Sequence, residues 1–147
     1  VDSDGQTYYL VAKQGPKPML NYALYKASIA SAGGVLTGTP LDCSVPVFPE
    51  YVKFDPSSKM LVGFAKDQQL GVYYLTITTE GKCALTKIDL PEKGVVTCGS
   101  YDPKRSLLYL AQATNEGARI YTYDTAKKQL ESSVLAPSFN PESLEVV

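Results

Sequence analysis

The sequence of 147 residues contains no histidine and no tryptophan. Without an imidazole the chain cannot build a Ser-His-Asp triad, a Cys-His dyad or a zinc site with histidine ligands. The three cysteines form no Cys-X-X-Cys pair, so the zinc and redox motifs that use such a pair are absent as well. These absences exclude several common catalytic and metal sites.

The chain also lacks an excess of charge of either sign, since 14 basic and 15 acidic residues leave a net charge of −1. A nucleic-acid-binding surface needs a basic stripe, and an anionic membrane surface attracts a polybasic patch. The longest nearly uncharged stretch, 27–40, is rich in Ser, Gly and Thr, which excludes a membrane-spanning helix there. We therefore expect no nucleic-acid partner and no membrane partner. We expect a soluble chain and leave its compartment open, with secretion as one alternative.

Apolar residues make up 44% of the chain, and tyrosine occurs 11 times against 4 phenylalanines. Tyrosine-rich and β-branched sequences suit pleated sheets with one wet face. The apolar residues alternate in short runs without helical spacing, so we expect an all-β protein. The expected strands are 7–13, 20–29 and 35–42, then 60–65, 71–78 and 84–90, then 107–113, 118–124 and 129–135.

A turn-and-strand motif occurs three times without gaps, at 1–13, 54–66 and 101–113. In each copy an aspartate stands at the start of a short polar turn, where its carboxylate can accept backbone N–H bonds. Asp2, Asp55 and Asp102 are spaced by 53 and 47 residues, and from Asp102 around the chain ends to Asp2 is again 47 residues. The motif therefore predicts three repeats that close cyclically.

One further strand precedes each turn, at 50–54 and 97–101, and the C-terminal segment 141–146 aligns with 49–54. The expected single unit thus has repeats of about 2–54, 55–101 and 102–147, each with four strands. A period of 40–50 residues with four strands is typical of propeller blades.

The third repeat shows the motif in full, as Tyr101-Asp102-Pro103, Leu108-Tyr109-Leu110, Ile120-Tyr121-Thr122-Tyr123 and Leu130. This pattern resembles the blades of lactonase-type β-propellers with six or seven blades. The resemblance implies an all-β chain of three four-stranded antiparallel blades. Propellers use 4–8 blades, so we expect a second copy to complete a six-bladed ring as a head-to-tail homodimer, or another chain to complete it.

The innermost strands of propellers line a central channel, and the resemblance places candidate ligand-binding residues there. They are Glu50, Tyr51, Lys53, Thr97, Cys98, Ser100, Glu142, Ser143 and Glu145. Glu50 and Glu142 occupy equivalent repeat positions, so two copies would bring four carboxylates to one end of the channel. Such a group could hold a divalent cation or raise the pKa of one carboxyl by mutual repulsion. The alternative is a solvated rim paired with lysines such as Lys53, and no motif requires a cofactor.

Three functions remain open at this level. The first is a binding or assembly module that presents a channel to a small molecule, glycan or protein. The second is an enzyme of the lactonase or hydrolase type that uses channel carboxylates, with or without a divalent cation. The third is a fragment of a larger propeller.

The repeat register also leads to an expectation for the cysteines. It assigns Cys43 and Cys83 to outer strands of different repeats and Cys98 to an inner strand. A disulfide needs Cα atoms within about 7 Å, so we expect no disulfide within the chain.

Overall fold

The computed structural model describes residues 7–14, 21–28, 38–40, 47–137 and 144. Within these residues the chain forms eleven β-strands and no helix, which confirms the expected all-β class. No helix that could cross a membrane occurs in this part of the chain. The strands are β1 (Thr7–Gln14), β2 (Asn21–Ser28), β3 (Gly38–Pro40), β4 (Phe48–Asp55), β5 (Met60–Lys66), β6 (Val72–Ile77), β7 (Cys83–Ile88), β8 (Val95–Asp102), β9 (Leu107–Thr114), β10 (Gly117–Asp124) and β11 (Gln129–Pro137).

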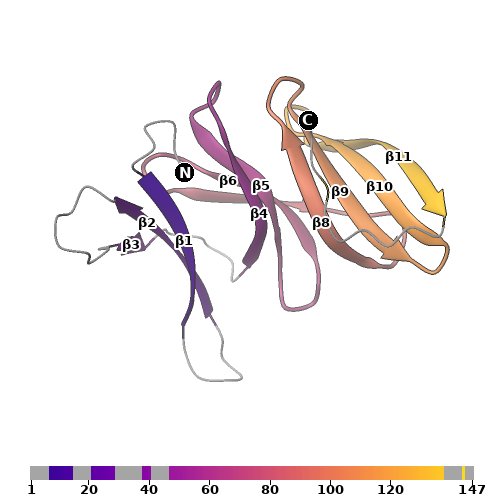
Figure 1. Ribbon diagram of the computed structural model, residues 1–147, viewed down its shortest axis with the longest axis horizontal. Helices are drawn as coiled ribbons and strands as arrows, with labels where there is room; N and C mark the ends of the chain where they lie inside the picture. The colour runs from indigo at the N-terminus through magenta and orange to yellow at the C-terminus, as the bar shows by residue number, and fades with distance from the viewer. Residues whose placement is uncertain (1–6, 15–20, 29–37, 41–46, 138–143, 145–147) are drawn as a thin grey trace.

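The strands form three antiparallel sheets in which consecutive strands are neighbours. Their orders are β1-β2-β3, β4-β5-β6-β7 and β8-β9-β10-β11. Figure 1 shows the three sheets side by side along the long axis, from the indigo first sheet to the orange and yellow third sheet. Two of the expected four-stranded units are therefore present. The fourth strand expected for the first unit, 142–146, lies almost wholly outside the described residues.

Aspartates open the turns where the sequence predicted them. The Asp55 carboxylate accepts a hydrogen bond from the backbone N–H of Ser57 at 3.0 Å, and Asp102 accepts one from Lys104 at 2.9 Å. Asp124 binds the β10–β11 turn in the same way. The predicted turn-forming role is thus confirmed for Asp55 and Asp102, because short polar side chains replace backbone partners that a tight turn cannot supply.

The two four-stranded sheets share an irregularity. The pairing of β4 with β5 skips Glu50, and the pairing of β8 with β9 skips Thr97. These residues are 47 positions apart, which is the spacing of the repeat. Each is the extra residue of a β-bulge, a device that bends a strand and redirects a side chain. The second and third sheets therefore share the same irregularity at positions 47 residues apart.

The facing sides of the second and third sheets pack together in one apolar core. Phe64 of β5 and Leu110 of β9 are fully buried there, and the rings of Tyr74 and Tyr123 lie 5.6 Å apart. Gly99 of β8 lies directly against the Phe64 ring, because a Cβ at Gly99 would lie 2.6 Å from the ring carbon Cε1. Glycine thus sets the close approach of β5 and β8.

The second sheet also has an apolar core on its other side. Leu61, Ala65, Leu75 and Ile77 are buried in this second cluster. A strand that is covered on both faces needs apolar residues at every position and not only at alternate ones. This requirement explains the uninterrupted buried run 61–65 in β5.

The structure contradicts the expectation for the cysteines. Cys83, the first residue of β7, is disulfide-bonded, whereas Cys98 is a free thiol. Cys43 lies outside the described residues. The expectation was wrong because it compared strand positions within the repeats only. β7 is the edge strand of its sheet, so Cys83 at its start is accessible to a cysteine that lies outside that sheet.

Candidate functional site

The channel candidates on β4 and β8 lie at adjoining edges of the second and third sheets (Figure 1). The backbone N–H of Tyr101 donates a hydrogen bond to Tyr51 Oη at 3.3 Å, and Lys53 Nζ donates to the Tyr101 carbonyl at 3.4 Å. Thr97 Oγ1 donates to the carbonyl of Ala111 at 3.4 Å. Tyr51 and Lys53 thus both connect β4 to β8 by hydrogen bonds.

Glu50 has a cationic partner that differs from the one the sequence suggested. Its carboxylate lies 3.0 Å from the ammonium of Lys66, at the end of β5, rather than against Lys53. Lys66 Nζ also donates to the carbonyl of Val96 at 3.0 Å, so the pair connects the second sheet to β8. An ammonium at this distance opposes a metal cation at Glu50. In the described part of the chain, no three acidic or cysteine residues gather in a metal-binding group.

Of the remaining candidates, Ser100 is buried in the third sheet and Cys98 is half-buried. Glu142, Ser143 and Glu145 lie outside the described residues. Of the described candidates, Glu50, Tyr51 and Lys53 therefore take part in contacts that join the second and third sheets.

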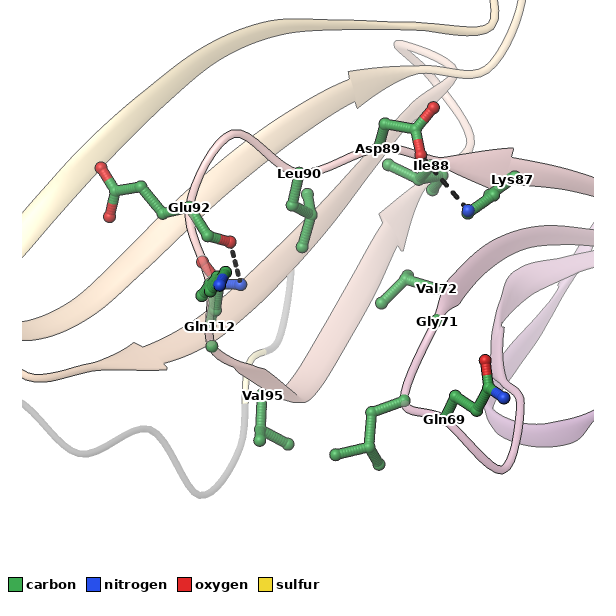
Figure 2. A pocket seen from close by; sticks show the side chains of 13 residues that line it. Gln69, Gly71, Val72, Lys87, Ile88, Asp89, Leu90, Glu92, Val95 and Gln112 are labelled. Atoms are coloured by element: carbon green, nitrogen blue, oxygen red, sulfur yellow. Dashed lines mark hydrogen bonds and ion pairs between the residues drawn. The ribbon is translucent and has the colours of Figure 1, made fainter.

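A cleft of about 410 Å³ lies elsewhere, between the second and third sheets at the end where the β5–β6 loop meets the β7–β8 connection (Figure 2). This volume falls within the roughly 300–1,000 Å³ of small-molecule sites. The lining residues are Gln69, Leu70, Gly71, Val72, Lys87, Ile88, Asp89, Leu90, Glu92, Lys93, Gly94, Val95 and Gln112.

The floor and the mouth of the cleft are apolar. Val72 and Ile88 are buried at its base, and Leu90 packs beside them half-buried. Leu70 and Val95 stand at the mouth with 51% and 40% of their surface exposed. Figure 2 shows Leu90 and Val72 on either side of the same space, with Val95 below them at the start of β8. Within the described residues, Val134 is the only other large hydrophobic side chain with such exposure.

Leu70 is held at the mouth in an unfavourable backbone conformation. Its φ is 64°, in the left-handed region, which costs a residue with a Cβ about 1 kcal/mol. The Asp67 carboxylate fixes this turn by accepting hydrogen bonds from the backbone N–H groups of Gln69 and Gly71, both at 2.8 Å. Tyr73 Oη donates to the same carboxylate at 3.0 Å. Burial alone would raise the pKa of Asp67, but these hydrogen bonds lower it below its ordinary value.

A polar network forms the opposite wall. Gln112 is 1% exposed; its Nε2 donates to the Glu92 carbonyl at 3.1 Å, and its Oε1 accepts from Tyr121 Oη at 3.1 Å. Arg119 Nε lies 3.0 Å from the Glu92 carboxylate, an ion pair in which the N–H does not point along the contact. This network fixes the β7–β8 connection, and both the nitrogen and the oxygen of the Gln112 amide are hydrogen-bonded in it.

Charges surround the mouth without cancelling fully. Lys87 and Asp89 form a loose exposed pair at 3.7 Å, and Glu92 is paired with Arg119. Lys93 forms no ion pair with any described residue. Among the described charged residues that line the cleft, Lys93 is therefore the one without an ion-pair partner.

A second cavity of about 300 Å³ lies between the same sheets at the opposite end. Asp55 Oδ2 accepts hydrogen bonds there from Ser58 Oγ at 2.8 Å and Tyr101 Oη at 3.3 Å. Burial raises the pKa of Tyr74, another lining residue, to about 12. The Ser58 and Tyr101 hydroxyls therefore already have the Asp55 carboxylate as their acceptor.

The sequence matches no protein-family model and no curated protein. Leu70, Val95 and Gln112 had not been singled out from the sequence. The sequence could have indicated them by their place in the expected sheets, because the β5–β6 loop and the β7–β8 connection lie at the same end of antiparallel sheets.

Proposed function

We propose that the chain is a ligand-binding module that takes a small amphipathic molecule into the cleft between the second and third sheets. The observation that carries the proposal is the pair of exposed side chains, Leu70 and Val95, at the mouth of an apolar cavity. Burying a whole Leu or Val side chain contributes about 1.5–3 kcal/mol. The exposed halves of these two therefore offer a ligand about 2 kcal/mol in total.

The ligand chemistry follows from the lining. An apolar body fits against Val72, Ile88 and Leu90, and a negatively charged head fits beside Lys93. A neutral apolar ligand would leave the lysine unused, and a cationic ligand would be repelled by it. We therefore assign the cleft to a small anion with an aromatic or aliphatic body.

In the same proposal, the sheets are blades of a β-propeller that resembles the lactonase type. The supports are the consecutive strand order in each sheet, the face-to-face packing and the adjoining first strands β4 and β8. The cleft then lies between two blades and not in the channel. The lactonase or hydrolase alternative has less support, because the Glu50 carboxylate is committed to Lys66.

The test uses 8-anilinonaphthalene-1-sulfonate, an aromatic anion whose fluorescence rises on binding to apolar sites. Leu70→Asn is the decisive variant, because asparagine tolerates a left-handed φ and removes the apolar contact without adding strain. We expect its dissociation constant to rise about fivefold, the equivalent of about 1 kcal/mol. Lys93→Gln should weaken binding by a smaller factor that disappears at high salt.

Two controls make the result specific. Lys128→Asn relieves the same strain at a residue with φ of 55° and removes one positive charge, but lies in the β10–β11 turn away from the cleft. Val134→Ser removes the remaining exposed apolar side chain. Both should leave the dissociation constant unchanged. If Leu70→Asn binds the probe as tightly as the unaltered chain, the cleft is not the site.

A further inference from the structure

The outer face of the third sheet, the face turned away from the second sheet, carries an inference beyond ligand binding. Leu108 and Leu110 point into the core shared with the second sheet. Strand alternation therefore directs Leu107 and Tyr109 to the outer face. Both are only half-buried there, and Val134, which pairs across the ladder with Ile120, is 65% exposed.

In the second sheet, the residues at the equivalent positions are buried under a neighbouring sheet. Val62 and Phe64 are 1% and 0% exposed because they pack on the third sheet. The residues 47 positions later are Tyr109 and Ala111, on the outer face of the third sheet. The ladders agree, since Phe64 pairs with Tyr74 as Ala111 pairs with Ile120. The outer face thus has the register of a surface that accepts another sheet.

The first sheet differs from the other two in its number of described strands. It has three strands where the other two sheets have four, and in the described chain β1 is an edge strand. Its strands correspond to the second, third and fourth strands of the other sheets, because Thr7 and Met60 both follow an aspartate turn in the repeated motif. The position equivalent to β4 and β8, beside β1, is therefore unfilled in the described part.

We propose that the outer face of the third sheet packs on the first sheet of a second copy of this chain, and that two such identical junctions close a ring of six sheets. Closed pairing by a two-fold axis uses each surface once and leaves no open end. Figure 1 places these two surfaces at opposite ends of the row of sheets, as such a ring requires.

The contact is large enough for a stable pair. A face of four strands of about eight residues covers roughly 500 Å², from strand spacings of about 4.8 Å and rises of about 3.3 Å per residue. The first sheet, whose three described strands have 8, 8 and 3 residues, offers a face of about 300 Å² by the same measure. Two junctions limited by this smaller face would bury about 1,200 Å² in total, at the lower end of the standard range for specific interfaces. The ligand cleft lies within one copy, so pairing and probe binding can fail independently.

Molar mass by light scattering over a dilution series tests the proposal. We expect twice the chain mass, with dissociation only on dilution. Val134→Asp should weaken the pair at least tenfold, because it places a charge in the contact. Ser133→Asp adds the same charge on the neighbouring residue of β11, which alternation turns to the other face, and should leave the mass unchanged.

Each other outcome overturns the proposal. A folded unaltered chain that stays monomeric at every concentration means that this face has a different occupant or none. Masses above two copies mean an open-ended contact and not a closed pair. If Ser133→Asp dissociates the pair as much as Val134→Asp, the outer face is not the interface. Circular dichroism of both variants checks that they keep the β-sheet content of the unaltered chain.

Discussion

The packing of Phe64 against Gly99 makes the contact between the second and third sheets measurable. In Gly99→Ala the new methyl carbon would lie 2.6 Å from the Phe64 ring and 2.8 Å from the carbonyl oxygen of Tyr109. The carbonyl belongs to β9 of the same sheet, so relief of that contact distorts the β8–β9 ladder, whereas relief of the Phe64 contact moves the second and third sheets apart. Overpacking of this kind costs about 1–3 kcal/mol of the free energy of unfolding. For a chain of this length that lowers the melting temperature by about 3–10 °C.

The cause can be separated from a general intolerance of alanine by a double-mutant cycle. Phe64→Leu alone leaves a void and costs about 1–2 kcal/mol. Because the shorter side chain makes room for the methyl group, the double variant should be more stable than the sum of the two by about 1 kcal/mol. Gly94→Ala is the matched control, since the atoms nearest to its added Cβ belong to Gln112 and Ala113. Its effect should add to that of Phe64→Leu when the two are combined.

Urea unfolding at fixed protein concentration measures the unaltered chain, the single variants and both double variants, so that any association contributes equally. Strict additivity of Gly99→Ala and Phe64→Leu would refute the reasoning. It would mean that the ring and the glycine do not meet, and that the two sheets are not packed as described.

Two further outcomes are expected. In denaturant without reductant, a thiol reagent should find one free thiol among the three cysteines, because Cys83 is bonded and Cys98 is free; a count of three would contradict the disulfide. Since the pKa of Asp67 is lowered below 3.8 on folding, its stabilising effect is complete above that pH and is lost as the pH falls through the folded-state pKa. Asp67→Asn should therefore be less stable at neutral pH and lose less stability on acidification, which unfolding curves between pH 5 and pH 2 would reveal; parallel curves would contradict it.

Strand positions were predictable because they depend on local alternation. The expected strands 60–65, 107–113 and 118–124 coincide with β5, β9 and β10 to within a residue or two at each end. The turn aspartates were predictable for the same reason, since Asp55 acts on residues next to it in the chain. Of the third expected strand, 35–42, the described residues Gly38–Pro40 form β3, and the others lie outside the described residues.

The candidate site was harder to predict from the sequence than the strands were, because it depends on contacts between sheets. Leu70 and Val95 are 25 positions apart in the sequence and line the same cleft only because two sheets stack. The partner of Glu50 was misassigned for a related reason. Lys53 is nearer in sequence, but the antiparallel ladder pairs Phe48, two residues before Glu50, with Lys66. The bonded state of Cys83 likewise depends on chain outside its own sheet.

The meander order of every sheet has a consequence for how the chain folds. Each described strand pairs only with its neighbours in sequence, so most backbone hydrogen bonds join residues that are close along the chain. Low sequence separation favours rapid formation of contacts, since little loop-closure entropy is lost. We expect hairpins such as β9–β10 to gain amide protection first in pulsed hydrogen exchange, and simultaneous protection of all sheets would exclude this order. The cleft, which exists only after two finished sheets dock, would then be among the last features to form.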